Sequence, residues 1–486
     1  MVRVLLINLP GESLRTPEEH CGLAFLKAYL DRKNINAEIL DAYALKYTVE
    51  ETKNKIKKWM IDVVEGKHFI GISPFVTSHE SFVKIGEYIK KLNPKCCVFA
   101  GGHYASLNRK VLIKNQWLDA IIVGEGEKTV LELVEKGIQR DIPGLYIGQD
   151  DKEFIFRNRI IDLDELPFQS RYLTMEQLHG QPMSITTSRG CYGECSFCSI
   201  SSFYKLNGKI KQTFRSASSV SEEIFQLVES YGIKSLKIVD DNFFRNRSDT
   251  FLEELADKIS GLNLSIRLSA RPNDITLYRA KLLKKMGVSI IGVGVESADL
   301  KSLKFFNKGI GIEASEKAIE ILTDNDITCL INYIMFNPII DIDGIKRNFE
   351  FIKKYKDRAI FHRINSHLWI RATDPLVQKL KQLKLCDEIT FPYVKCKYAN
   401  DDVWKLMKLF NKWCNHNMEK YYKYADVLMA KGVKENKCQE REYRKLLNKD
   451  VIILEELIHY CQMGRLENDG EKYIEKCLMK DSSSLY

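Results

Sequence analysis

Three cysteines, Cys191, Cys195 and Cys198, stand at the spacing Cys-x-x-x-Cys-x-x-Cys. Three thiolates on one short loop can wrap one corner of an iron–sulfur cubane. A [4Fe–4S] cluster has four irons, so three protein ligands leave one iron open. An open metal position is typical of a catalytic site rather than a structural one. The alternative is a structural zinc site, but zinc would need a fourth ligand nearby, and none is obvious.

The residues around this motif predict the elements that position it. The motif follows the stretch Ser184-Ile185-Thr186-Thr187, which opens a series of alternating strands and helices. Helices are expected at residues 219–231 and 314–325. A run of βα units that end in polar residues predicts a complete or partial (β/α) barrel, with its site at the carboxyl ends of the strands. The later strands are expected at residues 235–239, 264–268, 289–293, 329–333 and 359–362.

From about residue 184 to residue 375, the chain resembles the radical S-adenosylmethionine (SAM) superfamily. Arg371 and Ala372 depart from the family's usual Pro-Gly-Thr-Pro, which weakens only the expectation for that local turn. The resemblance rests on the three cysteines and on five further segments: Phe197 before the last cysteine, Phe214-Arg215-Ser216, Val239-Asp240-Asp241-Asn242-Phe243, Gly292-Val293-Gly294-Val295-Glu296-Ser297 and Arg371-Ala372-Thr373-Asp374-Pro375.

The resemblance implies reductive chemistry at a [4Fe–4S] cluster held by Cys191, Cys195 and Cys198. SAM would chelate the open iron, and its cleavage would give a 5′-deoxyadenosyl radical that abstracts a substrate hydrogen. A closed barrel top would shield that radical from water. The sequence names no further catalytic residue. The residues that the resemblance implies for SAM binding are Phe197, Ser216, Asp241, Arg267, Glu296, Ser297 and Tyr333.

Residues 2–147 predict a second α/β region. Helical spacing of apolar residues is found at residues 22–32 and 78–92. Repeated βα units of this kind predict a doubly wound, Rossmann-like parallel sheet with helices on both faces. Glycines follow several strands, and ligands bind outside the carboxyl ends of such strands. The short apolar runs expected as buried strands are residues 4–7, 37–40, 69–72, 97–100 and 120–123.

This region resembles the cobalamin-binding domain that precedes the radical SAM domain in one large class. The usual Asp-x-His-x-x-Gly loop is absent, because Gly66 stands in place of the Asp and His68 enters a strand. Cobalamin is therefore expected without a protein histidine on cobalt, and His103 is expected to be the one imidazole near the crevice. The residues implied for cobalamin binding are Asn8, Ser73, Thr77, Gly101, Gly102, His103, Gly124, Glu125 and Gly126.

The remainder of the chain is less informative. No strand is expected after about residue 376, and the tail is expected to be mostly helical. Aromatic residues between Trp404 and Tyr424 indicate core packing, with a lid over the substrate as the alternative. Six widely spaced cysteines after the barrel indicate free thiols rather than an auxiliary cluster. The expected division is 1–150 cobalamin-binding-like domain, 151–183 linker, 184–375 barrel and 376–486 helical substrate or lid domain.

Composition limits the class of protein. The chain has 486 residues, of which 45% are hydrophobic and 29% are charged, as in a soluble globular protein. No long apolar run or signal sequence is evident, so a cytoplasmic protein without membrane association is expected. The net charge of +9 is spread along predicted helices, and no nucleic-acid partner is expected. Thirteen cysteines in such a chain indicate metal or redox chemistry rather than disulfides.

These features favour a cobalamin-dependent radical SAM methyltransferase that acts on an unactivated carbon of a natural-product or peptide substrate, with an electron donor such as flavodoxin or ferredoxin. The alternative is a non-methylating enzyme with the same domains, which would catalyse rearrangement, ring contraction, oxidation or cyclisation. A methylthiotransferase would need a second cysteine triad, which Cys21, Cys96 and Cys97 do not form. A non-catalytic cobalamin or SAM sensor would not require an open iron.

Overall fold

The computed structural model describes residues 2–11, 18–61, 66–206, 208, 211–244, 248–434 and 436–483. The chain divides into two compact units. Unit 1 comprises Met1–Tyr192, Cys198–Ile233 and Val239–Asp241, and unit 2 comprises Gly193–Phe197, Lys234–Ile238 and Asn242–Tyr486. The four-part division expected from the sequence stays a prediction.

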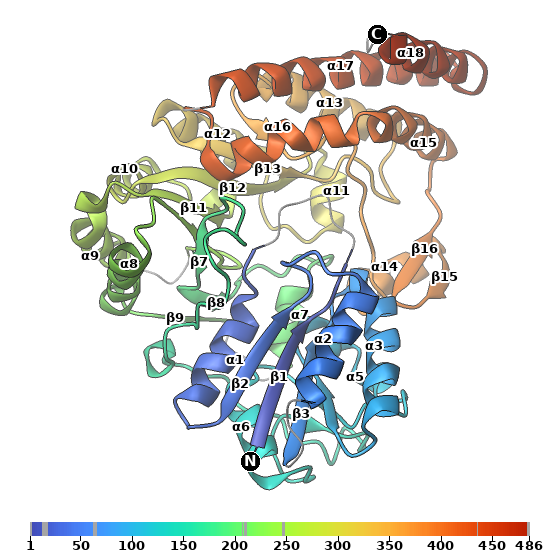
Figure 1. The fold of residues 1–486 in the computed structure, drawn as a ribbon. Helices are drawn as coiled ribbons and strands as arrows, with labels where there is room; N and C mark the ends of the chain where they lie inside the picture. The colour runs from blue at the N-terminus through green and yellow to red at the C-terminus, as the bar shows by residue number, and fades with distance from the viewer. Residues whose placement is uncertain are drawn as a thin grey trace. The chain divides into compact units, whose positions relative to one another are not determined.

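Unit 1 begins with alternating strands and helices (Figure 1). Its strands are β1 (Val2–Asn8), β2 (Asn36–Asp41), β3 (Lys67–Ser73), β4 (Cys97–Ala100), β5 (Ala120–Ile122), β6 (Leu145–Tyr146), β7 (Met183–Ile185), β8 (Ser188–Gly190) and β9 (Gln212–Phe214). Its α-helices are α1 (Cys21–Asp31), α2 (Val49–Ile61), α3 (His79–Leu92), α4 (Gly102–Leu107), α5 (Arg109–Leu112), α6 (Glu127–Lys136), α7 (Ser199–Lys205) and α8 (Ala217–Tyr231).

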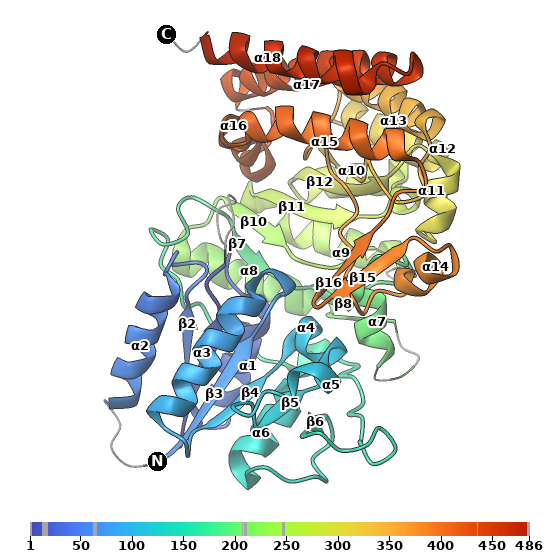
Figure 2. The same cartoon turned by 90° about the vertical axis from the view of Figure 1, so that its right-hand side faces the viewer.

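The first sheet of unit 1 confirms the doubly wound prediction. Its strand order is β2-β1-β3-β4-β5-β6, and the chain therefore winds outward in both directions from β1. All neighbours are parallel except β5 and β6, which pair antiparallel. Helices α1 and α6 contact each other on one face of this sheet, and α2 and α3 contact each other on the other face (Figures 1 and 2).

The β1 strand shows how the sequence builds this core. Val4 and Leu6 point to the face covered by α1 and α6, where they pack with Leu30 and Val130. All four side chains are fully buried. Burial on both faces explains why the strands read as continuous runs of branched apolar residues rather than as an alternating pattern.

The segment between β6 and β7, expected to be a linker, packs tightly within unit 1. Ile160, Leu163 and Leu166 form an apolar cluster with Tyr29 of α1. Further along, Arg171 pairs with Glu19 at 2.9 Å and with Glu223 of α8 at 2.9 Å. These three side chains are at most 7% exposed, so the segment ties the start of α1 to α8 through buried charges.

Unit 2 contains the main part of the barrel. Five of its strands are parallel neighbours in the order β14-β13-β12-β11-β10, which confirms the partial barrel. Its strands are β10 (Ser235–Ile238), β11 (Ser265–Ala270), β12 (Val288–Glu296), β13 (Thr328–Tyr333), β14 (Ile360–Phe361), β15 (Cys386–Thr390) and β16 (Tyr393–Cys396). Its α-helices are α9 (Asp249–Ile259), α10 (Leu277–Lys285), α11 (Leu300–Phe305), α12 (Ile312–Asp324), α13 (Ile342–Tyr355), α14 (Leu376–Gln382), α15 (Asp401–His416), α16 (Met418–Lys431), α17 (Lys437–Gln462) and α18 (Glu471–Ser483).

The expectation that no strand follows residue 376 is wrong. Strands β15 and β16 pair antiparallel as a two-stranded hairpin. Most of β15 is exposed, so its sequence carries no run of buried apolar residues to reveal it. The rest of the tail is helical as expected. Phe410, Trp413 and Tyr421 are at most 3% exposed, which confirms core packing for this part of the aromatic region.

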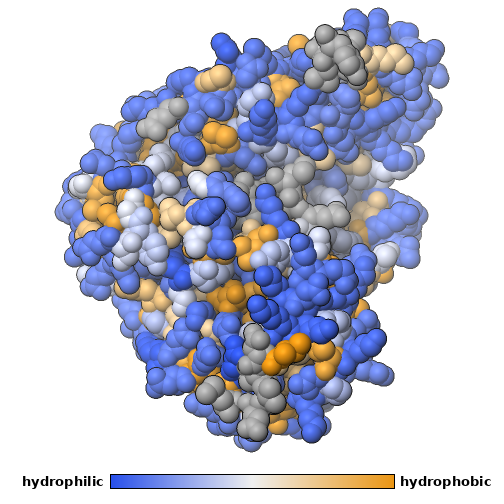
Figure 3. All heavy atoms as spheres, viewed as in Figure 1, coloured by the Kyte–Doolittle hydropathy of each residue, from blue (hydrophilic) through white to orange (hydrophobic). Residues whose placement is uncertain are grey.

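The surface view in Figure 3 shows a face covered mainly by hydrophilic residues, with scattered hydrophobic ones. Among the described residues, no helix is both long enough and apolar enough to cross a membrane.

Replacing Arg171 with Met should lower the unfolding free energy by about 3–5 kcal/mol, because Glu19 would lose its buried cationic partner. Urea unfolding of the wild type and the variant measures this difference. The control is Lys84→Met, which breaks the exposed Lys84–Glu80 pair and should leave the unfolding free energy unchanged within error. Equal effects of the two substitutions would contradict a stabilising role for the buried pair.

Candidate functional site

The residues predicted to bind cobalamin gather at the carboxyl edge of the first sheet in unit 1. The register places Asn8 of β1 opposite Asp41 of β2 and Ser73 of β3. The next strand leads into Gly101, whose N–H donates to the Ile72 carbonyl at 3.0 Å. The edge is completed by Thr77 in the turn after β3, Gly102 and His103 at the start of α4, and Gly124, Glu125 and Gly126 between β5 and α6.

A histidine that the sequence analysis missed also lies at this edge. His20 Nδ1 accepts from the Leu23 N–H at 3.2 Å, and His20 Nε2 lies 2.9 Å from Ser73 Oγ. In the neutral ring the proton is therefore on Nε2, which donates to Ser73. Tyr172 bonds both the His20 N–H and the Asp41 carboxylate. The prediction that His103 is the one imidazole near the crevice is wrong.

The other residues predicted to bind cobalamin differ in their exposure and in their contacts within the protein. The Asn8 amide donates to Asp41 at 2.7 Å, whereas Thr77 is exposed. The His103 ring packs on Phe203 of α7 with a centroid distance of 4.0 Å. Gly102 and Gly124 have φ angles of +85° and +87°, which a side chain would disfavour.

Glu125 lies in a buried ion-pair network. Its carboxylate accepts from the Ile160 N–H at 2.7 Å and lies 3.4 Å from Arg159 Nη2. Its side chain is only 7% exposed. Arg189, two residues before Cys191, reaches Glu125 at 3.8 Å and pairs with Glu127 at 2.6 Å. The loop therefore uses its carboxylates to bind two arginines of the same unit.

A buried carboxylate fixes the start of the cysteine motif. Asp240 accepts hydrogen bonds from the N–H groups of Thr187 at 2.7 Å and of Ser188 at 3.0 Å, and from both hydroxyls. The neighbouring Asp241 accepts from the Gly190 N–H at 3.0 Å. Desolvation raises the pKa of Asp241, and the nearby Asp240 carboxylate adds to the rise, whereas the hydrogen bond from the Gly190 N–H opposes it.

Within unit 2, Cys195 is buried next to a cation. Arg271 Nη1, at the carboxyl end of β11, lies 3.4 Å from Cys195 Sγ. Arg271 also donates to the Lys308 carbonyl, and Lys308 Nζ lies 3.1 Å from the Glu296 carboxylate. The chain Cys195–Arg271–Lys308–Glu296 thus joins a cysteine to a residue predicted to bind SAM.

A side chain at position 294 would displace the two charged groups of this ion pair. A Cβ there would lie 2.7 Å from Glu296 Oε1 and 2.9 Å from Lys308 Nζ. Glu296 itself has a φ of +70°, a strained value for a residue other than glycine. The Gly-x-Glu pattern thus places a carboxylate at the carboxyl end of β12, where barrel enzymes hold ligands.

Arg371, which departs from the family pattern, has a defined position. Its Nη2 donates to the Phe197 carbonyl at 2.7 Å, and its Nε donates to Asp374 at 3.1 Å. The Ser196 N–H donates to the Phe306 carbonyl at 2.8 Å, and the Phe197 ring packs edge-on against Phe306. Arg371 and Phe306 therefore hold the stretch between Cys195 and Cys198.

The remaining predicted SAM contacts have structural partners. The hydroxyls of Ser297 and Tyr333 bond the side chain of Asn348 in α13 at 2.9 and 3.0 Å. Arg267 donates to the Met429 carbonyl of α16 at 2.8 Å. Ser216 caps α8 by accepting from the Ser219 N–H. Their contacts with SAM stay predictions.

The donor set fits the expected groups. Cys191 and Cys198 belong to unit 1 and Cys195 to unit 2, and none of the three is in a disulfide. No three His, Cys, Asp or Glu side chains of the described residues converge on a single metal ion. Cluster cysteines bind different irons, so they need not converge in that way. Glycine backbone and a serine hydroxyl at the sheet edge suit a flat group with polar edges.

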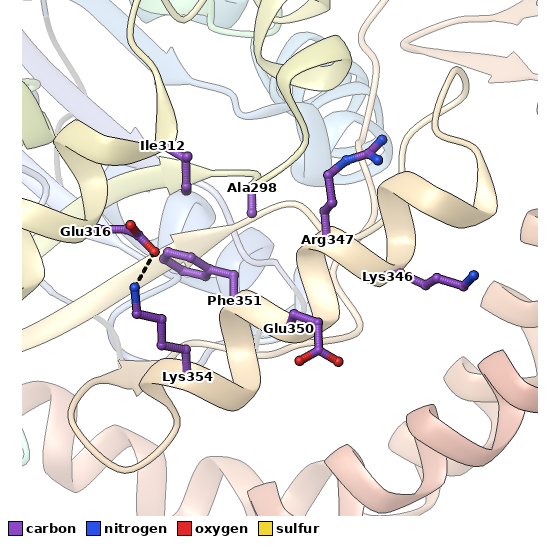
Figure 4. A pocket seen from close by; sticks show the side chains of 8 residues that line it. All are labelled: Ala298, Ile312, Glu316, Lys346, Arg347, Glu350, Phe351 and Lys354. Carbon is purple, nitrogen blue, oxygen red and sulfur yellow. Dashed lines mark hydrogen bonds and ion pairs between the residues drawn. The ribbon is translucent and has the colours of Figure 1, made fainter.

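A cavity of about 380 Å³ lies elsewhere in unit 2, beside α12 and α13 (Figure 4). None of its lining residues is among the predicted site residues, and Lys354 and Glu316 pair across it at 2.7 Å. The lining residues are Ala298, Ile312, Glu316, Lys346, Arg347, Glu350, Phe351 and Lys354.

Sequence reasoning missed His20, Arg271 and Lys308. Arg271 follows a predicted strand, so its place at a strand end was the available signal. His20 precedes α1 and reaches the sheet edge only through tertiary folding, and Lys308 is identified only by its contacts.

Family models match both the region expected to bind cobalamin and the region expected to form the barrel. Residues 10–134 match the B12 binding domain, and residues 185–352 match the Radical SAM superfamily.

The chain is similar to three curated relatives. The uncharacterized methyltransferase PH0819 of Pyrococcus horikoshii is 29% identical over 373 residues, 73% of this chain and 78% of the relative. The anaerobic magnesium-protoporphyrin IX monomethyl ester cyclase of Rubrivivax gelatinosus is 28% identical, over 64% of this chain and 58% of the relative. The hopanoid C-3 methylase of Methylococcus capsulatus is 28% identical, over 56% of this chain and 53% of the relative.

The cobalamin-dependent SAM radical enzyme OxsB, solved with aqua-cobalamin and SAM bound, has a similar fold. The TM-score is 0.79 at 16% identity, and the match covers 99% of this chain and 80% of OxsB.

Replacing Asp240 with Asn should remove the carboxylate charge and one of the two oxygens that accept from Thr187 and Ser188. The unfolding free energy of the iron-free protein should fall by roughly 2–4 kcal/mol, measured by urea titration. Asp164→Asn is the control, because Asp164 accepts from the Ser216 N–H at an exposed position. A stability loss in Asp164→Asn as large as that in Asp240→Asn would contradict the special role of Asp240.

Burial lowers the pKa of His20, with the Asp41 carboxylate opposing the shift. Below pH 6.5, the unfolded chain binds a proton at this residue that the folded chain does not bind until the lower folded pKa is reached. The unfolding free energy should therefore fall between pH 7.5 and 5.5, and by less in His20→Gln. Urea titrations at both pH values measure this difference, and equal losses in the two proteins would refute the assignment.

Proposed function

Because this chain belongs to the radical SAM superfamily and carries a B12 binding domain, we propose that it is a cobalamin-dependent C-methyltransferase acting on an unactivated carbon. The observation that carries the proposal is the presence of both domains on one chain, with Cys191, Cys195 and Cys198 at the cluster spacing. Similarity to a methyltransferase over 73% of the chain supports methyl transfer. A natural-product or peptide substrate is proposed from the sequence resemblance alone.

A specific observation also favours the second candidate, a non-methylating radical reaction such as cyclisation. One of the relatives is named a cyclase, and it matches 64% of this chain. The two candidates share every cofactor and differ only in the fate of the substrate radical. The arrangement of the described residues is therefore compatible with either reaction.

When bound, the cluster and SAM supply reductive hydrogen abstraction, and cobalamin supplies a transferable methyl group. The protein residues orient and insulate these groups. Arg271 holds a positive charge against Cys195. Asp240 fixes the start of the cysteine motif, and Arg371 fixes the stretch after Cys195.

Glu296 and Lys308 are proposed to contact SAM. Both side chains are at most 12% exposed, and they place opposite charges at the carboxyl end of β12. Such a pair suits the amino and carboxylate groups of SAM, since each charge can find a partner of opposite sign. Electrons are proposed to come from a small donor protein such as flavodoxin or ferredoxin, in the cytoplasm.

Anaerobic reconstitution with iron, sulfide and hydroxocobalamin, followed by metal counting and visible spectra, tests the cofactor assignment. The wild type should hold about four irons and one cobalamin per chain. Cys195→Ala should lose most of the iron, whereas Cys438→Ala, which removes an exposed cysteine outside the motif, should keep it. Iron without cobalamin would refute the methyltransferase reading and leave the radical SAM assignment standing.

Product analysis then separates the two candidate reactions. With a strong reductant and SAM, a methyltransferase should release S-adenosylhomocysteine in addition to 5′-deoxyadenosine. Release of 5′-deoxyadenosine alone, with cobalamin fully bound, would contradict methyl transfer and favour the second candidate.

A further inference from the structure

The loop between β5 and α6, together with the first residue of α6, contacts both flanks of the cysteine motif. Upstream of Cys191, Arg189 pairs with Glu127 at 2.6 Å and lies 3.8 Å from Glu125. Downstream of Cys198, helix α7 presents Tyr204, whose ring lies 4.1 Å from the Arg159 guanidinium. Arg159 in turn lies 3.4 Å from Glu125. Two arginines thus connect one acidic loop to the residues before and after the cysteines.

Arg159 also braces the strand that leads into the motif. Its Nη2 donates to the Arg189 carbonyl at 3.1 Å and to Thr213 Oγ1 at 3.1 Å. Arg189 and Thr213 are register partners in the β8–β9 ribbon. The same guanidinium therefore contacts both strands of the ribbon and the helix that follows Cys198. A shift of Arg159 would move both ends of the cysteine motif.

A second connection runs in parallel from the preceding glycine loop. His103 packs on Phe203 of α7 with a centroid distance of 4.0 Å. Helices α4 and α7 lie side by side (Figure 2). The segment after β4 thus contacts α7 directly, and the segment after β5 contacts the arginines that hold α7.

Burial decides what the two carboxylates can do. The side chains of Glu125, Glu127, Arg159 and Arg189 are 7%, 4%, 1% and 11% exposed. Two negative and two positive charges balance within this group, so its desolvation is compensated internally. Glu127 also occupies the first turn of α6, where the helix dipole favours an anion. Turning either carboxylate toward a ligand would leave a buried guanidinium without its partner.

We propose that Glu125 and Glu127 are positioning residues that act through Arg159 and Arg189 to hold the two flanks of the cysteine motif. The sequence resemblance implies that Glu125 contacts cobalamin, whereas its ion pairs assign it to positioning the cysteine motif. The inference rests on the proposed function only for the identity of the cluster. Its consequence is that the loop after β5 controls how firmly the cluster is retained.

The test compares full-length wild type, Glu127→Gln and Glu132→Gln after anaerobic reconstitution. Glu132 is a matched control, because it lies on the same helix and pairs with Arg157 at 2.5 Å, away from the cysteine motif. Each protein is challenged with a ferrous chelator, and the rate of iron release is measured. Glu127→Gln should release iron several-fold faster than the wild type, because Arg189, two residues before Cys191, loses its anionic partner. Glu132→Gln should match the wild type.

Two further measurements separate positioning from cofactor contact. Titration of the iron-free proteins with hydroxocobalamin should give the same affinity for wild type and Glu127→Gln. The electron paramagnetic resonance spectrum of the reduced cluster should change in Glu127→Gln and not in Glu132→Gln. Weaker cobalamin binding with an unchanged rate of iron release would overturn the proposal. Equal acceleration of iron release in both variants would also overturn it, because that result indicates only general destabilisation.

Two more variants keep the test decisive if Glu127→Gln folds poorly. Arg189→Lys keeps the charge but loses the forked geometry, and should release iron faster than the wild type; release at the wild-type rate would contradict the proposal. Exchanging the pair, with Glu127→Arg and Arg189→Glu together, should recover part of the retention that either single change removes. A wild type that binds no iron would count against the proposed function instead, which distinguishes the two failures.

Discussion

A guanidinium withdrawn from water must meet compensating groups inside the protein, and this constraint determines which segments of unit 1 lie together. Arg159, Arg171, Arg189 and Arg215 are all nearly buried. Their carboxylate partners come from distant parts of the chain: Glu19, Glu125, Glu127 and Glu223. An alternative packing of these loops would leave charges buried and unpaired, at a cost of several kcal/mol each.

Unit 2 meets the same constraint with a different partner. Arg271 is 8% exposed, and its guanidinium contacts a thiol sulfur and a backbone carbonyl. The cysteine motif is thus tied to a residue 76 positions away along the chain. The carboxylates of unit 1, in contrast, act on the residues that flank the motif.

The sequence predicted the parts of this protein that follow from local pattern. Branched apolar runs such as β1 identified the strands, and glycines after the strands identified the sheet edge where the predicted cobalamin contacts gather. The partner of Glu125 could not be predicted, because Arg159 lies in a segment without helix or strand periodicity that resembles a linker. The β15–β16 hairpin was missed for a related reason, since an exposed strand lacks the apolar run by which buried strands are recognised.

Buried ion pairs are a poor source of stability, because well-packed apolar side chains of the same size often do as well or better. Their value here is geometric. An apolar contact between α6 and the strand β8 could slide by a fraction of an ångström at little cost, whereas the pair of Arg189 and Glu127 loses energy as soon as its geometry changes. A reactive site needs its groups held within about 0.5 Å of the productive arrangement. Directional, charged contacts next to Cys191 and around α7 therefore suit a chain that has to hold a cluster beside a second cofactor.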